Sequence, residues 1–153
     1  MKKGILAVSF GTSHIDTMEK TIDVLEKEFA KTFEEAVVYR AFTSNMIIKK
    51  LKRTANIKVQ TVGEALEKMA ADGIEEVIVQ PTHVINGIEN DRMLQEVMEH
   101  MHLFRKVYVG KPLLSSVEDY KKAIHAVMEK TVIGEDEMLV LMGHGTDHHA
   151  NSA

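Results

Sequence analysis

The chain has 153 residues, of which 44% are hydrophobic and 27% charged, the balance of a folded domain rather than of a disordered segment. Its net charge of −4 offers no positive field to a polyanion, so nucleic-acid binding is not expected. Cysteine is absent, which excludes disulfides and thiolate metal sites, and no apolar run is long enough to cross a bilayer. The N-terminus lacks the apolar core of a signal peptide, so a cytoplasmic protein is expected.

Short apolar runs alternate along the chain with longer amphipathic segments. Strands are expected at residues 4–10, 36–42, 76–81, 106–110 and 137–142. Apolar residues at helical spacing predict helices at residues 17–32, 45–53, 62–71, 90–103 and 117–130. This alternation indicates an α/β fold with a doubly wound, mostly parallel four-stranded sheet, flanking helices in a flavodoxin-like arrangement, and one extra strand near the C-terminal end.

The end of the chain repeats its beginning. The motif Gly-Thr-X-His follows the first predicted strand at residues 11–14 and the last predicted strand at residues 145–148. Repeated units usually mean a duplicated architecture. We therefore expect residues 1–133 to form one complete α/β half, and residues 134–153 to be the first strand and loop of a second, truncated half.

Polar loops follow the predicted strands, at the edge where open parallel sheets bind their ligands. His144 is the most distinctive of these residues, because it stands between two glycines and its imidazole is presented with little packing around it. Imidazoles and a carboxylate at one edge suit a first-row divalent metal that is held and then released. The candidate residues are Ser9, Phe10, Gly11, Thr12, Ser13, Thr43, Ser44, His83, Glu89 and His144.

Each candidate also has a plain structural interpretation. Ser13, Thr43 and Ser44 are ordinary helix N-cap residues, the glycines can simply allow tight turns, and His83 and Glu89 are equally compatible with loop scaffolding. The phosphate-binding P-loop, the dinucleotide-binding glycine motif and the hydrolase nucleophile motif are all missing from the sequence. No nucleotide cofactor is therefore expected.

Five motifs in chain order resemble the class II tetrapyrrole chelatases, specifically the anaerobic sirohydrochlorin cobaltochelatases of cobalamin biosynthesis. They lie at residues 8–13, 40–48, 83–89, 112–120 and 142–150. The resemblance implies two similar α/β halves around a cleft, and a lyase that inserts Co²⁺ into sirohydrochlorin without ATP, with cobalt as the substrate metal.

The resemblance also implies roles for individual residues. His144 matches the family's first metal-binding histidine, and Glu89 matches a carboxylate in the same cleft, so both are expected to be catalytic. His144 would bind the metal and accept a pyrrole proton, with assistance from Glu89. The residues expected to bind the substrate are Ser9, Phe10, Gly11, Thr12, Ser13, Thr43, Ser44 and His83.

The sequence departs from the family in one respect, because the family's second catalytic histidine falls beyond Ala153. The chain is therefore expected either to be a truncated protein or to complete its cleft by pairing with a second copy. A homodimer is expected because residues 137–142 would otherwise form an orphan edge strand. The alternatives are a non-catalytic half-domain that binds metal or tetrapyrrole, an iron chelatase of siroheme synthesis, and a flavodoxin-like domain that binds a phosphorylated cofactor through residues 9–13.

Overall fold

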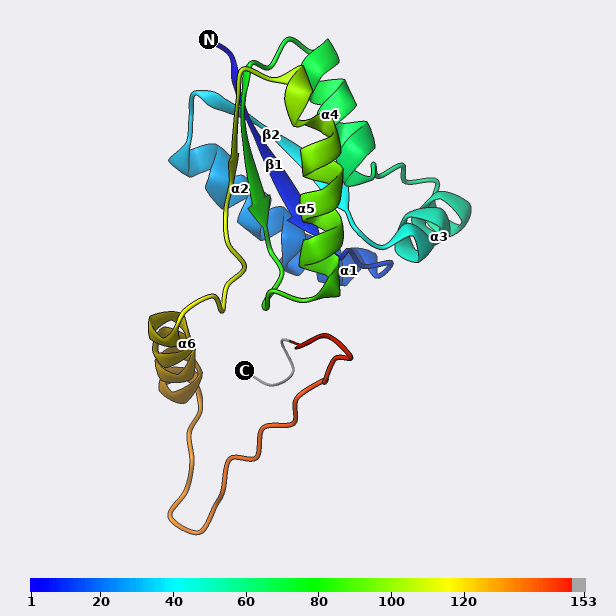
Figure 1. Cartoon of the computed structure of the whole chain (residues 1–153). Helices are drawn as coiled ribbons and strands as arrows, with labels where there is room; N and C mark the ends of the chain where they lie inside the picture. The colour runs from blue at the N-terminus through cyan, green and yellow to red at the C-terminus, as the bar shows by residue number, and fades with distance from the viewer. Residues whose placement is uncertain (150–153) are drawn as a thin grey trace.

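A four-stranded, all-parallel sheet with the strand order β2-β1-β3-β4 forms the centre of the computed structural model, which describes residues 1–149 (Figure 1). The strands are β1 (Lys3–Ser9), β2 (Ala36–Phe42), β3 (Glu76–Pro81) and β4 (Lys106–Val109). The predicted fold class, a parallel sheet with flanking helices, is confirmed. Among the described residues, no helix is long and apolar enough to span a membrane.

Helices cover both faces of this sheet, with α4 and α5 on one side and α1 and α2 on the other (Figure 1). The central strand β1 is buried on both faces, which explains why its sequence is a continuous apolar run. The helices are α1 (Ile15–Lys20), α2 (Ile22–Thr32), α3 (Asn45–Ala55), α4 (Val62–Ala71), α5 (Ile88–His100) and α6 (Val117–Lys130), with a 3₁₀ turn at Met101–Leu103.

Strand register places the functional loops at one edge. Ser9 at the end of β1 pairs with Phe42 at the end of β2, and Val8 pairs with Pro81 at the end of β3. The three strands therefore end at nearly the same level. The loops that follow them leave the sheet side by side, as the strand-end rule for parallel sheets predicts.

Two predicted elements differ from the structure by more than a shift of their ends. The single helix expected at residues 17–32 is divided into α1 and α2 at Thr21, whose φ and ψ of −126° and −76° are not helical. The Thr21 hydroxyl donates to the Thr17 carbonyl at 2.6 Å, the acceptor that the backbone N–H of Thr21 would otherwise use. This local competition accounts for the break at Thr21, although the helical periodicity of the sequence continues through it.

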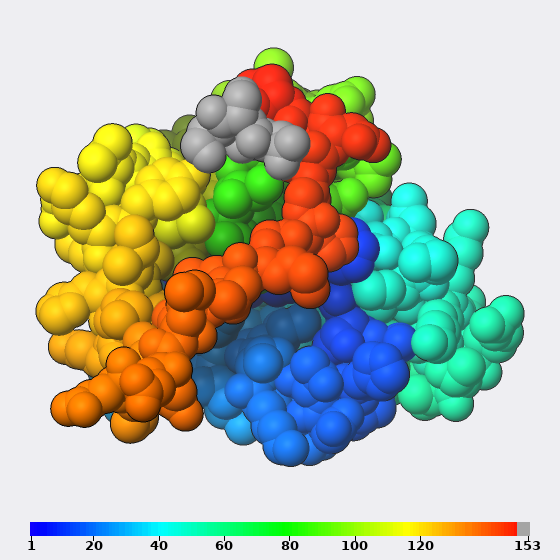
Figure 2. All heavy atoms as spheres, turned by 90° about the horizontal axis from the view of Figure 1, so that it is seen from below, coloured from blue at the N-terminus to red at the C-terminus, as the bar shows by residue number. Residues whose placement is uncertain are grey.

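The second difference is at the C-terminal end, where the extra strand expected at residues 137–142 is wrong. These residues have no strand conformation or strand partner in the described part of the chain, and Met142 is 95% exposed. A strand requires a neighbour to take its backbone hydrogen bonds, and residues 1–149 place none beside this segment. The segment instead returns beneath the carboxyl edge of the sheet, and Figure 2 looks onto that edge with the orange-to-red residues lying across it.

Candidate functional site

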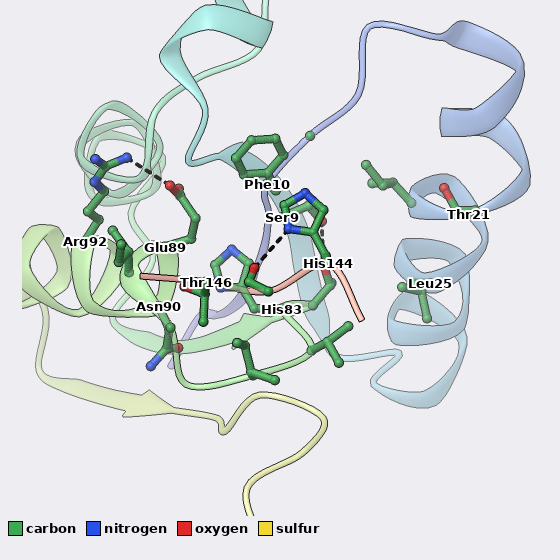
Figure 3. Close-up of a pocket in the computed structure, with 18 of the residues that line it drawn as sticks. Ser9, Phe10, Thr21, Leu25, His83, Glu89, Asn90, Arg92, His144 and Thr146 are labelled. Carbon is green, nitrogen blue, oxygen red and sulfur yellow. Dashed lines mark hydrogen bonds and ion pairs between the residues drawn. The ribbon is translucent and has the colours of Figure 1, made fainter. Parts of the chain in front are cut away.

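An open cavity of about 1050 Å³ lies at the carboxyl edge of the sheet, between the strand-end loops and the returning C-terminal segment (Figure 3). Its wall combines apolar side chains with a few polar ones from four parts of the sequence, within residues 9–11, 21–25, 82–92 and 144–147. The lining residues that matter below are Ser9, Phe10, Gly11, Thr82, His83, Glu89, Asn90, Arg92, His144 and Thr146.

The floor of the cavity is built from the ends of β1 and β3. Ser9 is 3% exposed, and its hydroxyl lies 2.7 Å from the hydroxyl of Thr82, so the two strand ends are joined by a side-chain hydrogen bond. The backbone carbonyl of His83 accepts from Leu113 N–H at 3.0 Å, which ties the loop after β3 to residues 112–116. These bonds fix the floor before any ligand arrives.

The repeated Gly-Thr-X-His motif forms the same turn in both copies. Gly11 and Gly145 have positive φ angles of +101° and +76°, a conformation that favours glycine. The Thr12 hydroxyl accepts from His14 N–H at 3.2 Å, and the Thr146 hydroxyl accepts from His148 N–H at the same distance. The sequence repeat is therefore also a structural repeat at the level of the turn.

His83 and Glu89 bring unsatisfied polar atoms to this cavity. Neither ring nitrogen of His83 has a hydrogen-bond partner among the described residues, and both are buried. Burial lowers the pKa of His83, while the nearby charge of Glu89 opposes that change, so His83 is a neutral imidazole at pH 7. Glu89 accepts from Arg92 Nη1 at 2.9 Å through Oε1, but its Oε2 is buried without a partner within residues 1–149.

Asn90 is a third polar residue of this kind, and sequence reasoning missed it. The side chain is 5% exposed, and its Oδ1 has no partner among the described residues. A buried acceptor without a partner costs about 1–3 kcal/mol, so several of them together on one cavity wall indicate a site built for a polar ligand. Its proximity to Glu89 in sequence was the available signal, but asparagine at a helix start is also an ordinary structural choice.

His144 reaches the cavity from the C-terminal segment (Figure 3). Its Nδ1 lies 3.1 Å from the carbonyl oxygen of Gly145. Since a carbonyl can only accept, Nδ1–H is the donor, and in the neutral ring Nε2 keeps its lone pair. That nitrogen is suited to binding a metal ion or a proton.

The structure therefore brings six of the ten predicted site residues to one cavity: Ser9, Phe10, Gly11, His83, Glu89 and His144. The other four do not line it. The Thr12 hydroxyl is used within its own turn, the Ser44 hydroxyl accepts from Ile47 N–H as the N-cap of α3, and Thr43 is buried beside it. Ser13 does not cap α1, whose N-cap is His14. A substrate role for these four stays a prediction.

Metal binding at His144 also stays a prediction. Within residues 1–149, no group of three or more His, Asp or Glu side chains is arranged to hold a metal ion. His148 and His149 lie with ring centroids 3.8 Å apart, and His148 Nε2 is 2.8 Å from Asp91 Oδ2 on α5.

Comparison with known proteins agrees with the resemblance drawn from the motifs. A family model described as "Cobalt chelatase (CbiK)" matches residues 3–153. A sirohydrochlorin cobaltochelatase from Salmonella typhimurium is 42% identical over 154 residues, which cover 100% of this chain and 58% of that protein. Sirohydrochlorin cobaltochelatase CbiKC from Nitratidesulfovibrio vulgaris is 33% identical over 156 residues, which cover 99% of this chain and 55% of that protein. The chain thus spans little more than half the length of these relatives.

A solved structure supports the fold. The crystal structure of a cobalamin (vitamin B12) biosynthesis CbiX protein from Marinobacter aquaeolei VT8 aligns with a TM-score of 0.54 at 15% identity, covering 85% of this chain and 94% of that one. At this identity the likeness concerns the fold alone.

Proposed function

The chain belongs to the cobalt chelatase (CbiK) family, and from this premise we propose that it takes part in inserting Co²⁺ into sirohydrochlorin, without ATP, in anaerobic cobalamin biosynthesis. One observation carries the proposal. The fold brings His144, Glu89 and His83 to a single cavity, although they come from distant or separate elements of the sequence. A cytoplasmic location belongs to the same proposal.

The reaction requires that Co²⁺ loses water ligands and that the macrocycle loses two pyrrole protons as four nitrogens bind the metal. A neutral imidazole binds Co²⁺ but can release it to the macrocycle, and His144 offers an Nε2 lone pair for this step. Glu89 offers Oε2, a carboxylate oxygen with no partner among the described residues, as a proton acceptor. His83 stays neutral and is proposed to contact the substrate.

The cavity wall also suits a flat macrocycle that carries carboxylates. Apolar residues such as Phe10, Ile22, Leu25 and Ile85 line it and offer a surface for the ring. Arg92 adds a cation that can pair with a carboxylate of the ring.

We further propose that residues 134–153 begin a second α/β half. The support is the turn that Gly145 and Thr146 form, which matches the turn of Gly11 and Thr12 at the end of β1. The remaining wall of the cleft would come from further residues of a longer chain or from a second copy. Sedimentation of the purified chain measures which arrangement it adopts: a dimer supports the second copy, and a monomer contradicts it.

The test of the function is direct. The purified protein is incubated with sirohydrochlorin and Co²⁺, and the absorbance spectrum of the macrocycle is followed. Spectral conversion to the cobalt complex that is abolished in His144→Ala and retained in His125→Ala supports the proposal, because His125 is exposed on α6 and outside the cavity.

Each of the remaining outcomes would favour one of the alternatives to a cobalt chelatase. Binding of sirohydrochlorin without conversion indicates a half-domain that only binds, and faster conversion with Fe²⁺ than with Co²⁺ indicates an iron chelatase. A chain that leaves the spectrum unchanged while it binds a phosphorylated cofactor would be the flavodoxin-like alternative.

A further inference from the structure

His148 anchors the C-terminal segment to helix α5. Its Nε2 lies 2.8 Å from Asp91 Oδ2, and its side chain is only 9% exposed, although Leu141 and Met142 earlier in the same segment are 72% and 95% exposed. The anchor is therefore a mostly buried side chain within a largely exposed segment. Between Met142 and His148 lies the loop that carries His144.

We propose that Asp91 is a positioning residue, which holds His148 and thereby fixes the loop that presents His144 to the cavity. The consequence for metal insertion rests on the proposed function, but the anchoring itself does not. Asp91 is not expected to touch the substrate, since it does not line the cavity.

Asp91 lies on the same turn of α5 as Glu89, which lines the cavity. Asp91 stands two residues after Glu89 in the first turn of the helix, and its backbone N–H donates to the Gly87 carbonyl at 3.1 Å. The same helical turn therefore carries Glu89 at the cavity and, about 200° further round the helix, Asp91 at His148. One helix thus carries both Glu89 and the attachment point of the segment that bears His144.

The loop itself has little steric restraint. A Cβ atom added at Gly143 or Gly145 would meet nothing within 4 Å, so neither position is held by packing. The Thr146 hydroxyl bonds to His148 N–H, a contact within the loop that shapes the turn but does not attach it to the sheet. The bond from His148 to Asp91 attaches the loop to α5, and a hydrogen bond to an ionised carboxylate is among the stronger ones available.

The experiment compares Asp91→Ala, His148→Ala and His148→Gln in the whole protein. The side-chain amide introduced by His148→Gln can place its Nε2 where the imidazole Nε2 stands, so it can still donate to Asp91, whereas alanine cannot. Glu99→Gln is the matched control, because Glu99 is an exposed carboxylate on α5, two turns beyond Asp91, that accepts from Gln95 on the same helix. Circular dichroism checks that each variant is folded.

Hydrogen–deuterium exchange of the peptide over residues 141–149 is the first readout. It should rise in Asp91→Ala and His148→Ala, stay at the wild-type level in Glu99→Gln, and be restored in His148→Gln. This readout needs no catalysis, so it tests the anchor even if the wild-type protein inserts no cobalt. If Asp91→Ala does not fold, the comparison of His148→Gln with His148→Ala decides the matter.

The second readout is the cobalt dependence of insertion. Loss of a residue that orients a metal-binding histidine typically weakens metal affinity or activity by roughly 10- to 100-fold, so KM for Co²⁺ should rise by that factor in both alanine variants. KM for sirohydrochlorin should change little, and the double alanine variant should be no worse than either single one. Exchange and cobalt KM that match Glu99→Gln, or a His148→Gln that behaves as His148→Ala, would overturn the proposal.

Discussion

Arg92 donates to Glu89 Oε1 at 2.9 Å within the first turn of α5, while Glu89 Oε2 stays buried without a partner among the described residues. Arg92 is also the one lysine or arginine among the described residues that line the cavity. A single guanidinium thus orients the carboxylate proposed to take a proton and places a positive charge where a carboxylated ring would bind. Both roles can be separated by substitution.

Replacing Arg92 by glutamine should weaken binding of the macrocycle more than it slows the chemical step. A hydrogen bond between charged groups contributes about 1.5–3 kcal/mol, so KM for sirohydrochlorin should rise by roughly 10-fold or more, with a smaller change in kcat. Arg92→Lys keeps the charge but loses the planar fork, so its KM for sirohydrochlorin should lie between those of the wild-type protein and Arg92→Gln. Arg53→Gln on α3, outside the cavity, is the control, and an equal rise in KM for that variant would refute the assignment.

Replacing Glu89 by glutamine should have the opposite kinetic pattern. The amide keeps the size of the side chain but removes the proton acceptor, and general bases commonly contribute roughly 10²–10⁴-fold to rate. We expect kcat for cobalt insertion to fall by at least roughly 10²-fold on the same basis, while binding of sirohydrochlorin, followed by its absorbance, is retained. A Glu89→Gln protein with wild-type kcat would exclude proton transfer through this residue.

Much of the fold follows from the sequence because the central strand β1 is buried on both faces and the other strands alternate with amphipathic helical segments. A strand buried on both faces has a continuous apolar sequence, so its end could be placed from the sequence, and with it the edge that carries Ser9 and His83. The strand expected at residues 137–142 failed for a related reason. Its apolar residues have the same pattern, but a strand also needs a neighbouring strand, and sequence alone does not supply that information.

The missed site residues share one cause. The helix expected to begin at residue 90 begins at Ile88, so Glu89 lies in its first turn and not in a loop. The two residues added at the start place Glu89 in the same helix as Asn90 and Arg92, so the helix geometry fixes the directions of these three side chains relative to one another. Asn90 and Arg92 line the cavity, and Asp91 contacts His148. This arrangement depends both on where α5 begins and on the path of the C-terminal segment, and the sequence alone gives neither.

His83 should make the stability of the protein depend on pH. Its folded-state pKa is lowered below the ordinary value of 6.5 by burial. As pH falls through 6.5, the unfolded chain therefore binds a proton that the native state excludes, and the free energy of unfolding decreases until the folded pKa is reached. Above that range both states are neutral at His83, and the effect vanishes.

In His83→Gln the free energy of unfolding should therefore decrease less steeply than in the wild-type protein as the pH falls. Urea unfolding followed by circular dichroism at several pH values between about 7.5 and 5 measures it, since this window spans the ordinary histidine pKa. His125→Gln is the control, because the side chain of His125 is 78% exposed. The quantity to compare between the two variants is the slope of the free energy of unfolding against pH. Parallel curves for wild type and His83→Gln would contradict the lowered pKa.

Gly11 and Gly145 occupy equivalent turns but should respond differently to substitution by alanine. Both have positive φ, which costs an L-residue roughly 1–2 kcal/mol. At Gly11 the new Cβ would also collide with the ring of Phe42, which is fully buried in the core, whereas at Gly145 it would meet nothing within 4 Å. Overpacking of a core adds about 1–3 kcal/mol, so Gly11→Ala should lower the free energy of unfolding by roughly 2–5 kcal/mol.

Gly145→Ala should change global stability much less, because its turn lies in a segment that adds no strand to the sheet. The strain there should appear instead as a weaker hold on the loop, seen as faster hydrogen–deuterium exchange over residues 141–149 at nearly unchanged Tm. Urea unfolding and exchange on the same two variants separate these effects. Equal losses of stability in both would mean that the two turns are coupled to the core to the same extent, and that the C-terminal copy is already part of the folded unit.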